Sequence, residues 1–283
     1  MTSAALIARP IARPLKAILS DPEGAIGFTL CAVVLVVTVL GPHLAPYNPA
    51  GVDMSARLVP PSLAHPFGTD ELGRDLLSRV LAGSQESIPA GLLVVAFSAV
   101  FGTMVGLFSG YYGSWVDMIL MRLTDVFVGY PALLLAIAVA AALGAGLEQA
   151  AVALATVWWA GYARLARAQA AAIRSSLSID AARSIGATDA RILIWHVLPS
   201  VIGPVIVKAT LDVALVIQSI AGLGFIGLGA QPPSSEWGLM IATAEQFALT
   251  SWWYAVFPGL ALFVVIEAFN LSGDALTKVW ARP

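Results

Sequence analysis

The chain alternates between long apolar stretches and shorter polar segments. Six of the apolar stretches are about 20 residues long or more, which is the length an α-helix needs to cross the hydrocarbon core of a membrane. They lie at about 25–45, 88–110, 116–143, 147–166, 201–229 and 252–276. The pattern predicts an all-α, polytopic membrane protein with six transmembrane helices.

The polar segments divide the chain into three regions. Residues 1–24 form a polar, basic tail, residues 25–85 hold the first span and a long polar segment, and residues 86–283 hold a five-helix core. A cleaved signal peptide is an alternative for the first apolar stretch. We favour a retained membrane helix, because the preceding tail is long and the stretch exceeds an ordinary signal core.

The longest polar interruption in the second half of the chain lies in a loop of about 171–200. Ser178 can cap a short helix through its hydroxyl. Gly186 can end that helix, because glycine adopts the left-handed conformation without steric cost. Thr188 can cap a second helix, which we expect Pro199 to interrupt. The loop is therefore predicted to hold two short helices at a sharp glycine corner. Spacing alone leaves open whether it binds a partner or is a solvated connection.

Another polar segment, residues 65–79, follows the first span. Thr69 can cap a short helix there, with leucines packed on one side and Arg74 and Arg79 in water. His65 and the neighbouring acids are candidate metal ligands, but capping explains the acids and a single histidine is a poor anchor. We expect a solvated surface helix and no metal site.

Composition supports the membrane assignment. Of the 283 residues, 59% are hydrophobic and 11% are charged, whereas about a quarter of the residues in a soluble domain are charged. The net charge of −2 argues against a nucleic-acid partner. Cys31 is the only cysteine, which excludes an internal disulfide and a cysteine-rich metal site.

Two pairs of opposite charges fall inside the predicted spans. Arg122 and Asp125 are three residues apart, and Lys208 and Asp212 are four apart. Residues at these spacings are neighbours on a helix. A lone charge facing lipid is costly, so we expect each pair to face protein or water.

Glycine and proline mark further positions in the spans. Pro131 predicts a kink in the third span. The second span carries three glycines four residues apart, a pattern that permits close helix contact in lipid. They are Gly102, Gly106 and Gly110.

The loop at 171–200 resembles the EAA loop of ABC importer permeases. The family pattern is E-A-A, three residues, G, nine residues, then I-x-L-P, and this chain matches it at Ala181, Ala182, Gly186, Leu198 and Pro199. Asp180 stands in place of the Glu, and His196 in place of the Ile.

Further stretches are similar to the C-type permease subunit of dipeptide, oligopeptide and nickel importers. They include H-P-F-G-T-D-E-L-G-R-D-L-L-S-R, W-W-A-G-Y-A-R-L-A-R-A-Q and A-G-L-G-F-I-G-L-G-A-Q-P-P-S-S-E-W-G. The resemblance covers nearly the whole chain.

The resemblance implies a type I importer fold, a homologous second permease, two ATPase subunits that bind ATP and Mg, and an external substrate-binding protein. It implies that the loop is a coupling helix for the ATPase, with candidate residues Asp180, Ala181, Ala182, Ile185, Gly186, Ala187, Asp189, Arg191, Leu193, Leu198 and Pro199. In this family the fifth helix helps line the pathway. The pathway candidates in this chain are charges inside the spans and glycines of the fifth helix, namely Arg122, Asp125, Lys208, Asp212, Gly222 and Gly224.

Lysine and arginine counts predict the orientation. With a cytoplasmic N-terminus, ten of these residues fall inside and three outside, in agreement with the positive-inside rule. We therefore expect a bacterial inner-membrane protein with both termini and the loop in the cytoplasm. The ten are Arg9, Arg13, Lys16, Arg164, Arg167, Arg174, Arg183, Arg191, Lys278 and Arg282, and the three are Arg57, Arg74 and Arg79.

The chain lacks the motifs of an enzyme. It has no G-x-x-x-x-G-K-[ST] for ATP, no H-E-x-x-H and no G-x-S-x-G. We therefore expect a non-catalytic pore subunit that contacts membrane lipid and needs no cofactor of its own. A proton-coupled secondary transporter and a non-transporting scaffold are the alternatives. The resemblance covers importers of dipeptides, oligopeptides, nickel chelates and haem-type molecules, and the sequence does not select among them.

Overall fold

A computed structural model describes residues 21–281 of the chain. The regular secondary structure of this part is helical apart from one isolated antiparallel bridge between Thr69 and Asp75. The long helices are α2 (Pro22–Leu44), α3 (Leu76–Tyr112), α6 (Leu147–Arg174), α9 (Leu198–Phe225) and α11 (Trp253–Ala281). The shorter ones are η2 (Met54–Ala56), α4 (Ser114–Val128), α5 (Ala132–Leu143), α7 (Leu177–Ser184), α8 (Asp189–Ile192), η3 (Leu193–Val197), α10 (Trp237–Ala244) and η4 (Glu245–Phe247).

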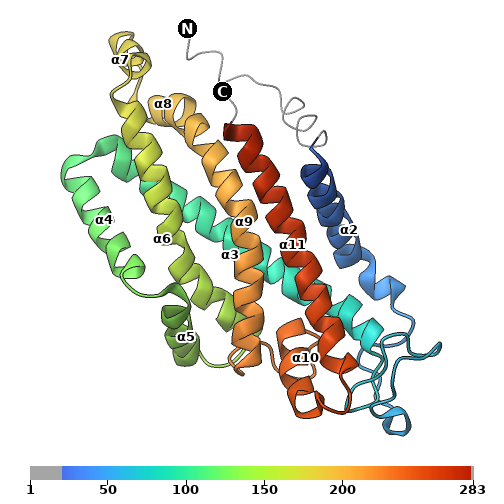
Figure 1. The fold of residues 1–283 in the computed structure, drawn as a ribbon. Helices are drawn as coiled ribbons and strands as arrows, with labels where there is room; N and C mark the ends of the chain where they lie inside the picture. Colours follow the sequence, from blue (N-terminus) through green and yellow to red (C-terminus); the bar gives the residue numbers. More distant parts are fainter. Residues whose placement is uncertain (1–20, 282–283) are drawn as a thin grey trace.

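Helices α2, α6, α9 and α11 run roughly side by side, α3 passes obliquely behind them, and several of the short helices lie at the two ends of the bundle (Figure 1). The start of α2, the end of α11 and the α7–α8 segment lie at one end. The opposite end holds α10 and the segment that precedes α3, while α4 and α5 lie on the flank. The expected N-terminal tail falls largely on residues 1–20, outside the described part.

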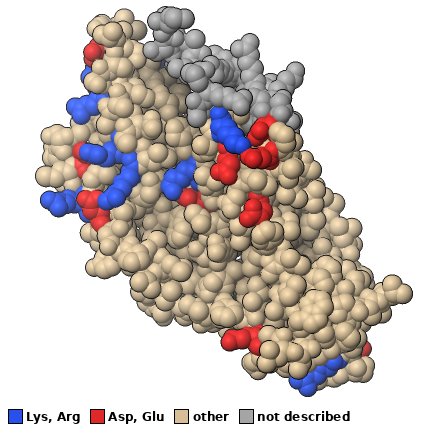
Figure 2. All heavy atoms as spheres, in the orientation of Figure 1, with Lys and Arg blue, Asp and Glu red and all other residues tan. Residues whose placement is uncertain are grey.

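The charged side chains are also distributed between the two ends of the bundle. On the face shown in Figure 2 they gather toward the two ends, and a broad region without charges separates them. Helices α2, α3, the continuous run Asp189–Phe225, and α11 are long and apolar enough to cross a membrane. The pair α4 and α5 counts as a fifth candidate if its two helices form one span.

The six predicted spans are thus matched by four or five candidates. Helix α6 has 28 residues and would be the sixth, but its composition is not that of a lipid-facing span. It carries Glu148, Gln149, Arg164 and Arg167, and its buried side is made largely of alanine. An interior helix can be less apolar, because its neighbours shield it from lipid.

The contact between α3 and α6 depends on small residues. A Cβ atom on Gly102 would lie 2.2 Å from the carbonyl oxygen of Trp159, and one on Gly106 would lie 2.3 Å from that of Ala163. At Gly110 the corresponding distance is 2.5 Å. No side chain fits at such distances, so the three glycines bring the two backbones together as the sequence predicted.

Two predictions about proline need correction. Around Pro131 the third span breaks into α4 and α5, which meet at 85°, more sharply than a kink. Pro199, in contrast, does not interrupt the helix. The five-residue π-helical turn Leu193–Val197 leads directly into α9, and the Leu198 N–H bonds back to the Leu193 carbonyl. Because proline lacks an N–H, it is tolerated in the first turn of α9.

The predicted surface helix at 65–79 is also wrong. Thr69 does not cap a helix; its hydroxyl accepts from the Val59 N–H and donates to the Ala56 carbonyl. Helix α3 begins only at Leu76, where the Asp75 carboxylate accepts from the Ser78 N–H at 2.8 Å.

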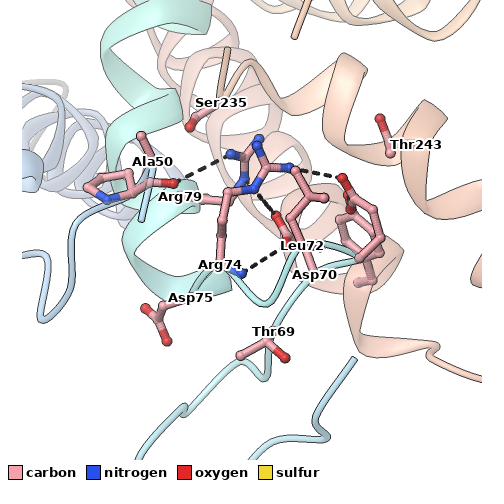
Figure 3. A network of polar contacts seen from close by, with 12 residues as sticks. Ala50, Thr69, Asp70, Leu72, Arg74, Asp75, Arg79, Ser235 and Thr243 are labelled. Carbon is pink, nitrogen blue, oxygen red and sulfur yellow. Dashed lines mark hydrogen bonds and ion pairs between the residues drawn. The ribbon is translucent and has the colours of Figure 1, made fainter. Parts of the chain in front are cut away.

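The two arginines expected in water are buried, with 6% of Arg74 and 3% of Arg79 exposed. Both face the fully buried Asp70 carboxylate (Figure 3), at 2.6 Å from Arg74 Nε and 3.4 Å from Arg79 Nε. Arg79 also donates to the Ser234 carbonyl at 2.8 Å. Removing one partner from a buried ion pair costs about 3–5 kcal/mol, so this cluster fixes the segment before α3 onto the bundle.

Candidate functional site

The α7–α8 segment has the predicted helix–glycine–helix form. Helix α7 starts two residues earlier than expected, with Ser176 at its N-cap position in place of Ser178. Gly186 adopts φ +81° in the turn that follows α7. Thr188 caps α8 as predicted, and its hydroxyl accepts from the Arg191 N–H at 3.4 Å. The corner is therefore set by local sequence signals.

One side of this segment packs onto the ends of α3 and α6. Ile179 and Ile192 are fully buried and Ala182 is 5% exposed. They form a cluster of their own with side chains of α3 and α6, including Tyr111 and Ala170. This small second core holds both short helices against the bundle.

A polar contact reinforces that core. The Tyr111 hydroxyl donates to the Asp189 carboxylate at 2.5 Å. The Arg183 guanidinium lies 5.7 Å from the centre of the Tyr111 ring and donates to its hydroxyl at 3.4 Å. This hydrogen bond raises the pKa of Arg183 above its ordinary value, so the guanidinium stays charged.

Other side chains of the segment are exposed, and four of them are large and apolar. We call these four, Leu177, Ile185, Ile194 and Trp195, the α7–α8 surface. Leu177 is 87% exposed and Ile185 is 86% exposed. Large exposed apolar side chains are typical of a protein or membrane interaction site.

The sequence prediction identified only part of this surface. Asp180, Ala181 and Arg191 are exposed, whereas Ala182 faces the core. Ala187 and Leu193 are partly buried against the second core. Leu177, Ile194 and Trp195 were missed, because the family pattern marks neither the first residue of α7 nor the π-helical turn.

The charges inside the predicted spans pair differently from the prediction in one case. Lys208 and Asp212 form the expected ion pair at 3.0 Å. Asp125 instead pairs with Arg164 of α6 at 2.7 Å. Arg122 is exposed and forms no ion pair within residues 21–281. Asp125 therefore links α4 to α6 rather than to a neighbour on its own helix.

An open cavity of about 430 Å³ lies between α4 and α6, and Asp125 and Arg164 line it with Met121 and Arg167. Arg167 is held by Asp117, with its Nε and NH2 groups 2.5 and 2.6 Å from the two carboxylate oxygens.

The two glycines proposed for the pathway do not line this cavity. They lie near the C-terminal end of α9. A Cβ on Gly222 would meet no atom within 4 Å, whereas one on Gly224 would lie 2.8 Å from Glu236 Oε2.

The acids around His65 have partners other than a metal. His65 Nδ1 lies 2.9 Å from Asp75 Oδ1, and Asp70 is held by the two arginines. In the described part of the chain, His, Cys, Asp and Glu side chains form no group of three that could hold a metal ion.

Residues 102–282 match the model of a protein family described as "Binding-protein-dependent transport system inner membrane component". The chain belongs to this family. It is a permease subunit of a bacterial ABC importer, that is, a multi-pass inner-membrane component without catalytic activity. Such a system includes an ATPase and a substrate-binding protein as partners, and ATP hydrolysis takes place in the ATPase.

Several permeases are similar over most of their length. The "Probable D,D-dipeptide transport system permease protein DdpC" of Escherichia coli (strain K12) is 46% identical over 247 residues, which are 87% of this chain and 83% of that protein. The glutathione transport system permease protein GsiD of Escherichia coli O6:K15:H31 is 42% identical over 86% of this chain and 81% of its own length. The dipeptide transport system permease protein DppC of Alkalihalophilus pseudofirmus is 38% identical over 89% and 83%, respectively.

A solved structure shares the fold. A chain from the inward-facing MetNI methionine ABC transporter superposes with a TM-score of 0.55, at 19% identity, over 71% of this chain and 96% of that one. The ABC importer permease fold that the resemblance implied is therefore confirmed, while the number of six membrane spans is not.

Proposed function

We propose that the permease transmits ATPase motion to the membrane through the α7–α8 surface. The observation that carries this proposal is the two-sided build of the segment. One side is locked onto α3 and α6 by Ile179, Ile192 and the Tyr111–Asp189 hydrogen bond. The other side presents Leu177 and Ile185 to a partner. A force applied to the exposed side thus reaches the long helices without passing through a flexible linker.

The complete importer is proposed to hold this chain, a homologous second permease, two ATPase subunits and an external binding protein. Both termini and the α7–α8 surface face the cytoplasm in this arrangement, with α10 outside. We count six crossings. Helix α6 is the sixth, because its 28 residues span about 42 Å at 1.5 Å per residue.

The proposed coupling elements are the sequence candidates at 180–199 together with the α7–α8 surface. Alternating access then moves α9, and the pathway candidates are the two charges of α4 and the charges and glycines of α9. They are Arg122, Asp125, Lys208, Asp212, Gly222 and Gly224.

The proposed substrate is a dipeptide or a short peptide. Support comes from the printed names of the similar permeases, which refer to D,D-dipeptides, glutathione and dipeptides. The other ligands of this branch, nickel chelates and haem-type molecules, are tested as competitors in the same uptake assay.

The test is reconstitution of the full complex in liposomes, with uptake and ATP hydrolysis measured together. Ile185→Asp places a charge on the α7–α8 surface and should lower both uptake and the stimulation of hydrolysis by loaded binding protein. Ile185→Leu keeps the apolar surface and serves as the matched control.

Two outcomes would overturn the proposal. Uptake that an uncoupler abolishes while ATP is held constant would favour a proton-coupled transporter. Purification of the chain without any ATPase would favour a scaffold.

A further inference from the structure

A charged cluster lies within the bundle, where α9 packs against α6. Lys208 Nζ lies 3.1 Å from Asp212 Oδ1 and 3.0 Å from Oδ2, on the next turn of the same helix. It also lies 5.0 Å from the centre of the Tyr162 ring of α6. The cluster stands near the middle of the 28-residue α9, so these charges lie deep in the membrane-spanning part of the molecule.

One polar atom of this cluster is buried and lacks a hydrogen bond within the described residues. Asp212 is 4% exposed and Tyr162 is fully buried. Asp212 is paired with Lys208, whereas the Tyr162 hydroxyl has no hydrogen-bond partner of good geometry, although it lies near the Asp212 carboxylate. Buried polar groups are nearly always satisfied, so an unused donor beside a carboxylate calls for an explanation.

Lys208 differs from Asp212 and Tyr162 because its side chain is partly exposed, so a solute can reach it. Its side chain is 31% exposed, against 6% for the Asp212 side chain. The end of its side chain packs against Gly161 of α6, where a Cβ would lie 3.3 Å from Lys208 Cε and 3.5 Å from Nζ. An ammonium group has three N–H donors. One of them serves Asp212, which leaves two for another acceptor.

We propose that Lys208 binds the carboxylate of the transported solute during its passage, an inference that rests on the proposed function. The solute is of the class that carries a free carboxylate, as a peptide does at its C-terminus. When the ammonium turns toward this group, the Tyr162 hydroxyl donates to Asp212 in its place. The buried Asp212 charge then keeps a partner in both states, which accounts for the unused donor.

The experiment measures dipeptide uptake by the reconstituted complex. A panel of radiolabelled dipeptides is tried first, and the one that the wild-type complex takes up fastest becomes the probe. If the complex takes up none, the proposed function has failed and the inference fails with it. Normal wild-type uptake isolates the inference, which the variants then test.

The decisive variant is Lys208→Leu/Asp212→Leu, which removes both charges and leaves no unpaired ion to disturb assembly. Its uptake should fall about tenfold or more, the loss expected for one charge-assisted hydrogen bond, while it still assembles with the ATPases. Lys208→Arg keeps the charge and should keep most of the uptake. Thr210→Val on the same helix is the control, because the Thr210 hydroxyl bonds only to the Ile206 carbonyl.

Wild-type uptake by the double variant would show that the pair serves assembly alone and would overturn the proposal. If that variant does not assemble, Tyr162→Phe decides. It removes a hydroxyl that has no hydrogen-bond partner among residues 21–281, so assembly should persist while uptake falls several-fold. Full uptake by an assembled Tyr162→Phe complex would equally overturn the proposal.

Discussion

Replacing Gly186 by valine tests the coupling role most directly. Gly186 has φ +81°, and a Cβ atom added there would meet nothing within 4 Å. The substitution therefore causes no clash, and its whole cost is backbone strain. Holding a residue other than glycine in an unfavoured backbone region costs about 1–3 kcal/mol, with β-branched residues at the upper end.

The corner relieves this strain by changing its turn angle, which moves α8 relative to α7. If this movement lowers the binding free energy between the permease and the ATPase by about 2 kcal/mol, the ATPase should bind roughly thirtyfold more weakly. Membrane insertion should be normal, because Gly186 is exposed and lies outside the long helices. Transport and the stimulation of ATP hydrolysis by loaded binding protein should fall together.

The assay is the liposome reconstitution, with ATPase binding measured separately by titration. Gly186→Asn is the matched variant, because asparagine tolerates the left-handed region far better than valine. It should keep most of the coupling. The reasoning is refuted if valine leaves binding and stimulation unchanged, or if asparagine is as harmful as valine, since the effect would then not arise from φ.

Two further predictions concern the membrane region and its orientation. Either Lys208→Leu or Asp212→Leu alone should impair assembly more than the double change, because each leaves one unpaired charge in the membrane; single variants that assemble fully would contradict this. In a Cys31→Ala background, an impermeant thiol reagent applied to intact cells should label a cysteine at Leu63, which is fully exposed in the segment before α3, and not one at Gly186. Labelling at position 186 alone would reverse the proposed orientation.

Local sequence signals predicted much of the fold and of the α7–α8 segment. The conformation of Gly186, the cap at Thr188 and the Lys208–Asp212 pair each depend on residues within one or two helical turns. The glycine stripe on α3 was also predictable, because its four-residue spacing is a property of one helix even though its partner is α6.

What was missed depends on contacts between distant parts of the chain. Arg79 looked solvated because its partners, Asp70 and the Ser234 carbonyl, are brought to it only by the folded bundle. Asp125 has a possible partner three residues away, yet α6 offers Arg164 at a better position. Spacing along one helix cannot show which of two such partners lies closer in space.

The close contact between α3 and α6 makes the two helices move as one lever. One end of this lever is anchored at Arg79, within the buried cluster that holds the preceding segment, and the other end is at Tyr111, against α8. The two residues are about 48 Å apart at 1.5 Å per residue. A tilt of a few degrees imposed at the Tyr111 end displaces the Arg79 end by several ångströms. The segments before α3 and before α10 must follow, since Arg79 binds them both to the lever.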